Sequence, residues 1–131
     1  ASTYYFSFGN DATYKGLLSD YQYPQASANL ALQPFELAMG TYSRNDAGKV
    51  VIDKSWYQND GIVNSVSHRA PNGHPVVNYV AGSTPQKGVW NYMGNRDGWD
   101  HFDVIGILSD KSQSTVTDFY FSHAAFLRTL N

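Results

Sequence analysis

The stretch Asp97-Gly-Trp-Asp-His-Phe-Asp-Val-Ile-Gly106 places a histidine, His101, among three aspartates directly after a predicted strand. That strand, Gly88-Val-Trp-Asn-Tyr-Met93, is short and rich in apolar and aromatic residues, and the segment from 94 to 98 breaks it with two glycines. Chemically active side chains in α/β folds lie where parallel strands end. The stretch therefore favours an α/β fold with a functional loop at His101.

Three interpretations of His101 remain open on the residues alone. The first is a polar surface loop, since a single histidine is more often structural or solvated than catalytic. The second is a metal site built from His101, Asp100 and Asp103, although neighbours in one loop rarely converge on one ion and no His-x-x-x-His spacing supports it. The third is a general base at the carboxyl end of a strand.

The other three histidines have simpler interpretations. His68 and His74 lie in a loop rich in glycine and proline, and we expect both to be solvated. His123 falls on the apolar face of a predicted C-terminal helix, so we expect it to be core or half-buried. The chain has no Gly-x-Ser-x-Gly motif and no cysteine, so it lacks these two nucleophile signatures.

Composition narrows the class of protein. The 131 residues, 14.6 kDa, are enough for one domain, and the net charge of −2 without a basic stripe argues against a nucleic-acid binder. The absence of cysteine excludes disulfide scaffolds and Cys-type zinc sites. No apolar run is long enough for a transmembrane segment. Aromatic residues make up 15%, and Glu36 is the single glutamate beside ten aspartates, which predicts a loop-rich chain.

The regular elements that the pattern predicts are few. Strands are expected over residues 3–8 and 76–80 in addition to 88–93, whereas 14–34 is expected to be loop with a helical turn. One helix is predicted from Ser112 or Ser114 to the end, because apolar residues recur there at three- and four-residue steps. These are Val116, Phe119, Tyr120, His123, Leu127 and Leu130.

A possible partner for His101 lies in the tight turn Asn59-Asp-Gly61, which contains Asp60. Ordinary turn chemistry is the simpler interpretation of this aspartate, because Asp-Gly is a common turn pair. However, Asp60 precedes His101 by 41 residues. An acid followed by a histidine is the end of the Ser, Asp, His order of α/β-hydrolases.

Three blocks together carry a resemblance to a known family. They are Asn59-Asp-Gly-Ile-Val-Asn64, Lys87-Gly-Val-Trp-Asn-Tyr-Met-Gly94 and Trp99-Asp-His-Phe-Asp-Val-Ile-Gly106. In order and spacing they closely resemble the bacterial lipase family that includes the staphylococcal and thermophilic bacillus lipases. The resemblance spans essentially the whole chain, yet it covers only the last third of the family's catalytic domain.

The resemblance implies a role for each residue of the pair. Asp60 matches the triad acid of the family, and His101 matches the triad base. The nucleophilic serine of Gly-x-Ser-x-Gly and the oxyanion donors belong to an upstream part, so the implied partner is an N-terminal lipase fragment. The implied substrates are lipids or other carboxylic esters, and the implied location is outside the cell.

The resemblance also implies a structural calcium near the histidine. One family ligand matches Asp103, two residues after His101. A second falls on Leu108, which has no carboxylate, so the nearest acid is Asp110. A backbone carbonyl would fall near Ser27. Because calcium takes six or more oxygen ligands, the loss of one carboxylate weakens this site.

The implied fold is the C-terminal portion of an α/β-hydrolase, residues 1–131, with the last strands of the sheet and the C-terminal helix. A full sheet of that kind needs roughly 200 residues or more, so we expect a separate N-terminal segment to complete it. The chain, cleaved from that segment or made separately, should be inert and poorly soluble alone. The alternative is a non-catalytic, aromatic-rich binding module that retains the lipase C-terminal fold.

Overall fold

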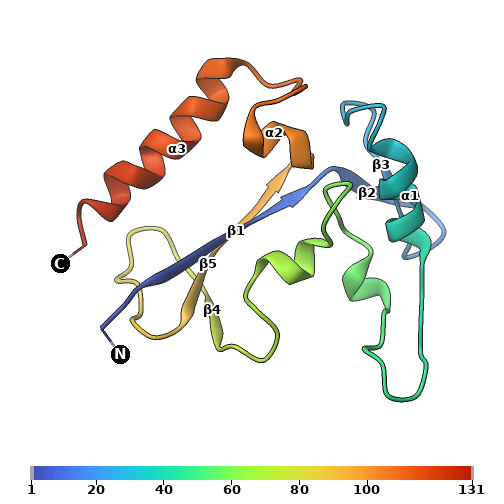
Figure 1. Ribbon diagram of the computed structural model, residues 1–131, viewed down its shortest axis with the longest axis horizontal. Helices are drawn as coiled ribbons and strands as arrows, with labels where there is room; N and C mark the ends of the chain where they lie inside the picture. The colour runs from blue at the N-terminus through green and yellow to red at the C-terminus, as the bar shows by residue number, and fades with distance from the viewer. Residues whose placement is uncertain (1, 131) are drawn as a thin grey trace.

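Three parallel strands cross the middle of the molecule in the computed structural model, which describes residues 2–130 (Figure 1). Strands β1 (Tyr5–Asp11), β5 (Trp90–Asp97) and β4 (Val76–Asn78) pair in the order β1-β5-β4, and both pairings are parallel. The chain is thus a small mixed α/β domain, as the sequence predicts. Because the strands are parallel, the loops after β1 and β5 leave the sheet at the same edge.

Strands β1 and β5 run further than the sequence predicts. Their register shifts between Ser7 and Gly9, so that β5 contains one residue more than β1 across this interval. Gly94 lies in that interval with φ +103, a conformation that favours glycine. The glycine predicted to end the strand therefore marks a bulge, after which the pairing continues to Asp97.

A hairpin occupies part of the segment 14–34, where a loop with a helical turn is expected, and a helix begins at its end. Strands β2 (Thr13–Lys15) and β3 (Gln22–Pro24) are antiparallel, and helix α1 (Gln33–Thr41) packs on β3. The sequence pattern does not predict α1, because this helix buries Glu36 and Gly40 rather than an apolar stripe. A Cβ at Gly40 would lie 2.1 Å from the carbonyl oxygen of Gln22, which shows how closely the two elements approach.

Helix α3 (Gln113–Leu127) is the long helix on one side of the sheet in Figure 1, and it is confirmed with its predicted cap. The Ser112 side chain accepts a hydrogen bond from the Thr115 backbone N–H. The helix packs on β1 through ring edges, with Phe8 and Phe119 centroids 5.0 Å apart. His123 is half-buried against Phe8, as expected.

Three short helices complete the described chain. The 3₁₀ helices η1 (Lys54–Trp56) and η2 (Ser65–His68) lie between α1 and β4, and α2 (His101–Ile105) follows β5. In residues 2–130 no helix is long and apolar enough to cross a membrane. The fully buried side chains are largely polar, and the largest of them belong to Glu36, Asn59, Asn91, Asp60 and Asp103. Most of these lie near the carboxyl end of the sheet.

Candidate active site

The turn that carries Asp60 is held against the end of β1. The Ala12 backbone N–H donates to the carbonyl oxygen of Asn59 at 2.9 Å. The Asn59 amide group donates to the carbonyl oxygens of Glu36 (3.1 Å) and Tyr57 (2.9 Å), and its oxygen accepts from Gly61 N–H. Asn59 and Asp60 are 0% exposed. The turn is therefore fixed by the main chain of three separate segments.

The Asp60 carboxylate is oriented by its own turn. Its Oδ1 accepts hydrogen bonds from the backbone N–H groups of Ile62 (3.0 Å) and Val63 (2.8 Å), which leaves Oδ2 to face the sheet's carboxyl edge. Gly61 has φ +92, and a Cβ there would lie 2.8 Å from Leu32 Cβ. Only glycine fits at position 61 without a shift of Leu32, the residue that precedes α1.

His101 begins α2 immediately after β5 and meets Asp60. Its Nδ1 lies 3.0 Å from Asp60 Oδ2, and its backbone N–H donates to the Asp60 carbonyl oxygen at 2.9 Å. The contact between these two residues that the sequence predicts is therefore present. The His101 side chain is 34% exposed, whereas Asp60 is buried, so Nε2 is the ring nitrogen left for a nucleophile. This is the arrangement that orients a histidine as a general base.

The loop that was expected at His101 is a helical turn instead. Asp100 accepts from the backbone N–H groups of Phe102 (2.8 Å) and Asp103 (3.0 Å), and Asp103 accepts from Asp100 N–H (2.9 Å). This reciprocal capping box fixes the first turn of α2, and Gly106 ends it with φ +68. The carboxylates beside His101 thus position its backbone and do not converge with it on a metal.

A second histidine contacts the same carboxylate. His68 Nε2 lies 3.5 Å from Asp60 Oδ2, and its side chain is only 15% exposed. The expectation that His68 is solvated is wrong, because η2 turns it inward against β1 and the Asp60 turn. His74 is exposed, as expected. No pattern in the sequence distinguishes the two, since both lie in the same loop-rich segment.

Other acids crowd this end of the sheet. Glu36 is 0% exposed, and neither of its carboxyl oxygens has a hydrogen-bond partner among the described residues. Burial, together with repulsion from Asp100, Asp60 and Asp11, raises the pKa of Glu36 to about 8. Burial likewise raises the pKa of Asp11, against the hydrogen bonds from Thr13 that lower it. Glu36 is thus mainly neutral at pH 7, which limits the negative charge around Asp60.

The carboxylates expected to hold calcium have partners within the chain. The Asp103 carboxylate already accepts from Asp100 N–H, from the Ser109 hydroxyl at 2.5 Å and from Lys111, whose Nζ lies 3.4 Å away. Lys111 also pairs with Asp110. Among residues 2–130 there is no group of three or more His, Cys, Asp or Glu that could hold a metal. The Lys111 ammonium thus lies beside both carboxylates that the resemblance assigns to calcium.

The backbone segment near Ser27, also expected to reach the calcium, is tied to the same region by a different residue. The Asn29 backbone N–H donates to Asp100 Oδ2 at 2.8 Å, and its side chain donates to the Leu108 carbonyl oxygen at 2.9 Å. Leu108 has φ +54, in the left-handed region. Asn29 therefore joins the segment before α1 to both sides of α2.

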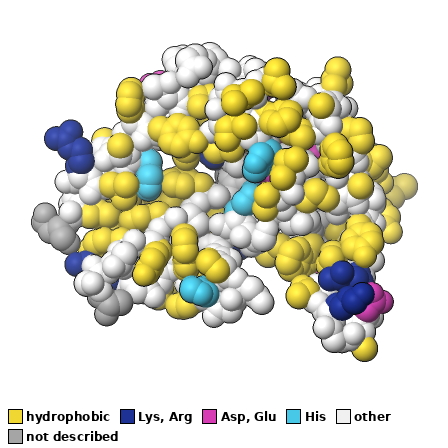
Figure 2. Space-filling view, in the orientation of Figure 1, with side chains coloured by type: hydrophobic (Ala, Val, Ile, Leu, Met, Phe, Trp, Pro, Cys, Tyr) yellow, Lys and Arg dark blue, Asp and Glu magenta, His cyan; other side chains and the backbone are white. Residues whose placement is uncertain are grey.

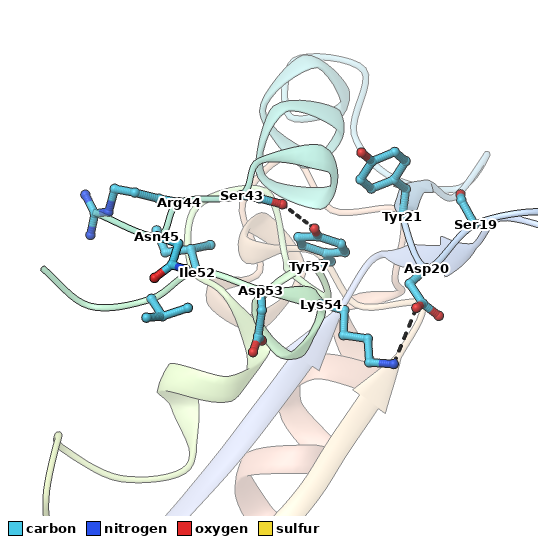
Figure 3. A pocket seen from close by; sticks show the side chains of 11 residues that line it. Ser19, Asp20, Tyr21, Ser43, Arg44, Asn45, Ile52, Asp53, Lys54 and Tyr57 are labelled. Atoms are coloured by element: carbon cyan, nitrogen blue, oxygen red, sulfur yellow. Dashed lines mark hydrogen bonds and ion pairs between the residues drawn. The ribbon is translucent and has the colours of Figure 1, made fainter. Parts of the chain in front are cut away.

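An open pocket lies on another part of the molecule, between the β2–β3 hairpin and the loop that leads to η1 (Figure 3). An ion pair between Lys54 and Asp20 (3.4 Å) and a hydrogen bond between Ser43 and Tyr57 border it. It contains neither Asp60 nor His101. It touches the site only through Tyr57, whose carbonyl oxygen accepts from Asn59.

Comparisons with known proteins agree on one family. A family model described as the C-terminal domain of lipase-like proteins matches residues 3–128. The lipase of Staphylococcus hyicus is 29% identical over 119 residues, which are 88% of this chain and 18% of that protein. Lipase 1 of Staphylococcus aureus strain Mu50 is 33% identical over 102 residues, 78% of this chain and 13% of the relative. The chain thus spans less than a fifth of these relatives.

Solved structures show the same relationship. EstA from Clostridium botulinum is 33% identical with a TM-score of 0.84, over 98% of this chain and 29% of that one. The Staphylococcus hyicus lipase is 28% identical with a TM-score of 0.79, over 95% of this chain and 30% of that one. The resemblance to staphylococcal lipases is therefore confirmed. Because the family model matches nearly every residue, the chain belongs to the lipase-like C-terminal domain family.

Proposed function

We propose that this chain supplies the acid and the base of a Ser-Asp-His ester hydrolase. The observation that carries the proposal is the contact between His101 Nδ1 and Asp60 Oδ2 at 3.0 Å, with Asp60 buried and His101 partly open. A base needs an orienting group at this distance, and the pair lies where parallel strands end. The substrates we propose are lipids or other carboxylic esters.

In the proposed mechanism, His101 Nε2 accepts the proton of a serine hydroxyl while the serine oxygen attacks the ester carbonyl carbon. His101 then returns that proton to the leaving alcohol, and an acyl-enzyme remains. A water molecule repeats the sequence and releases the acid. Throughout, Asp60 holds the Nδ1–H tautomer and stabilises the imidazolium form of His101.

The serine and the oxyanion donors belong to an N-terminal part that bears Gly-x-Ser-x-Gly, in the same longer polypeptide or in a second chain. Coverage of only about a third of each related structure supports this division. That part would also complete the sheet beside the three strands described. We further propose that the enzyme is secreted, which a blot of the culture medium with an antibody to this chain tests.

No metal enters the proposal. The Lys111 ammonium pairs with Asp103 and Asp110, the two carboxylates that the resemblance assigns to calcium. Burial raises the pKa of Asp103, but hydrogen bonds from Ser109 and Asp100 and the Lys111 ammonium lower it below its usual range. The resulting ionised carboxylate is compensated within the chain by these donors and by the Lys111 ammonium.

The test is ester hydrolysis by the complete protein that contains this chain. His101→Ala removes the base, and Asp60→Asn, which loses the correct tautomer, lowers kcat by roughly 10⁴-fold. His74→Ala is the matched control, because His74 is exposed and takes no part in the contact between Asp60 and His101, and it leaves the rate unchanged. Retained turnover in His101→Ala overturns the proposal and favours the non-catalytic binding module. The isolated 131 residues are expected to be inert.

A further inference from the structure

His68 is held with both ring nitrogens engaged. The Asn10 backbone N–H, at the end of β1, donates to His68 Nδ1 at 3.3 Å. On the other side of the ring, Nε2 lies 3.5 Å from Asp60 Oδ2. Because Nδ1 accepts a hydrogen bond, it carries a lone pair, and the proton of the neutral ring must be on Nε2. His68 is therefore set as a donor toward Asp60.

The backbone around His68 is anchored independently of Asp60. The Ser65 hydroxyl donates to the Asn10 carbonyl oxygen at 2.6 Å, and Ser65 N–H donates to the Gln58 carbonyl oxygen at 2.8 Å. The Ser7 hydroxyl donates to the carbonyl oxygen of Arg69, the next residue, at 2.6 Å. These bonds fix η2 on the edge of β1, so the ring approaches Asp60 from a rigid support.

The charged groups around His68 favour its neutral form. Burial lowers the pKa of His68, and repulsion from His101 and from Arg96 acts in the same direction, while Asp60 opposes them. Arg96 is fixed nearby, because its side chain donates to Asn10 Oδ1 at 2.7 Å and packs on the Phe119 ring. A neutral ring with its proton on Nε2 presents that N–H toward Asp60 without adding a positive charge.

We propose that His68 is a positioning residue of the Asp60–His101 dyad, which donates from Nε2 to the same carboxylate oxygen that orients His101. The inference rests on the proposed function. With Ile62 and Val63 N–H on Oδ1, a donor on each side of Oδ2 fixes the plane of the carboxylate. His68 cannot replace His101 as the base, because neither of its nitrogens is open.

Two substitutions separate the donor from the rest of the ring. In His68→Gln the amide nitrogen can take the place of Nε2 and donate to Asp60. In His68→Asn the shorter side chain can still accept from Asn10 near the position of Nδ1, but it cannot reach Asp60. A third variant, Ser65→Ala, removes the hydrogen bond to Asn10 that anchors η2 and leaves every donor to Asp60 in place.

The experiment measures kcat and KM of ester hydrolysis against pH in the complete protein, with active sites counted by a serine-reactive probe. We expect His68→Asn to lower kcat about two- to tenfold with KM unchanged, the range for one lost hydrogen bond. The acidic limb of kcat/KM should move up by roughly half a pH unit, because Asp60 keeps more charge to stabilise protonated His101. His68→Gln should restore both values.

Ser65→Ala should lower the melting temperature without a shift of the acidic limb. Equal losses in the Gln and Asn variants, or an Asn variant with the wild-type limb and kcat, overturn the inference. If His101→Ala stays active in the same assay, the proposed function itself fails. If it is inactive while His68→Asn behaves as wild type, only the role of His68 fails. Counting active sites keeps the comparison valid if a variant folds poorly.

Discussion

The region around Asp60 and the layer between β1 and α3 are built in different ways. Around Asp60 the buried groups are polar, and several have directional partners, as Asn59 and Asp100 illustrate, whereas Glu36 has none. Between β1 and α3 the contacts are ring edges, such as Phe6 on Phe126 at 5.4 Å, and the rings are only partly covered. One region is fixed by hydrogen-bond geometry and the other by apolar contact.

The difference indicates which part of the molecule depends on its surroundings. Hydrogen bonds within the chain already specify the dyad, since both partners of each bond are present. The apolar surface is less complete: Leu17 and Leu18 are fully exposed, and Phe121 on α3 is 69% exposed. Apolar side chains are also spread over the face of the molecule that Figure 2 shows. The geometry of the site is thus more self-contained than the stability of the fold.

Phe8→Ala should have the largest effect on stability among the changes considered for these two regions. Its ring contacts Phe119 and His123 at centroid distances of 5.0 and 4.9 Å. Because Phe8 is half-buried, we expect a loss of about 2–3 kcal/mol, below the range for a phenylalanine in a full core. Urea unfolding of the complete protein measures it, and the pH dependence of activity per folded molecule should not change.

The matched control for Phe8→Ala is Phe121→Ala, on the same helix. Phe121 faces solvent in this chain, so we expect a change within about 0.5 kcal/mol. A loss as large as that of Phe8→Ala would show that the rest of the protein covers this side of α3. The contrast between a self-contained site and an exposed apolar surface would then hold for the isolated chain only.

Glu36→Gln tests the polar region around Asp60. At acidic pH, where the Glu36 carboxyl is protonated, we expect the variant to lower the free energy of unfolding by about 1–2 kcal/mol, because a buried carboxamide also lacks partners. The pKa of Glu36 is raised from 4.5 to about 8 by burial first. The folded state therefore holds a proton that the unfolded chain releases, so stability falls as pH rises between these values. The variant should lose that slope, so its deficit is seen at acidic pH and it should exceed the wild type before the pH reaches about 8.

Urea unfolding of both proteins across this pH range gives the measurement. The difference between variant and wild type isolates Glu36 from Asp11, whose pKa burial also raises. Identical slopes in the two proteins would mean that Glu36 is ionised in the fold, with a partner from outside this chain. The polar region would then be as dependent on its surroundings as the aromatic layer.

Sequence patterns predict the elements whose apolar residues follow a regular period. Strand β1 and helix α3 were found in this way, and the turn at Asp60 and the base candidate His101 were found through spacing and resemblance. Helix α1 was missed because its buried face carries Glu36 and Gly40. Pro34 near its start and Glu36 in its first turn were the available signals.

The contacts that surround the dyad depend on long-range placement. His68 is turned inward by Asn10, 58 residues away, and no local pattern reports that bond. The capping box of α2 can be predicted from the sequence, since Asp100 and Asp103 have the spacing of such a box and Gly106 follows. In the fold these two acids cap α2, whereas the sequence alone also allows a surface loop or a metal site. Short helices with few apolar positions are therefore the elements that periodicity misses.

The smallest expected effect concerns the charge beside α2. Lys111 Nζ lies 3.4 Å from Asp103 Oδ2 and also pairs with Asp110, and its side chain is 19% exposed. Replacing it by methionine should cost about 1 kcal/mol, because the buried Asp103 keeps its bonds from Ser109 and Asp100 N–H. Lys49→Met is the control: Lys49 forms an exposed pair with Asp46 at 3.8 Å and should cost almost nothing.

A chelator should leave the melting temperature of the wild type unchanged, because the Lys111 ammonium already neutralises the carboxylates that calcium would need. In Lys111→Met the same carboxylates lose that charge, and added calcium then has a site to compete for. If chelation lowers the melting temperature of the wild type, Lys111 is not the sole counter-charge of these carboxylates, and Asp103 and Asp110 are again candidates for calcium ligands. The carboxyl end of the sheet would then, like the aromatic layer, need a component that the chain itself does not supply.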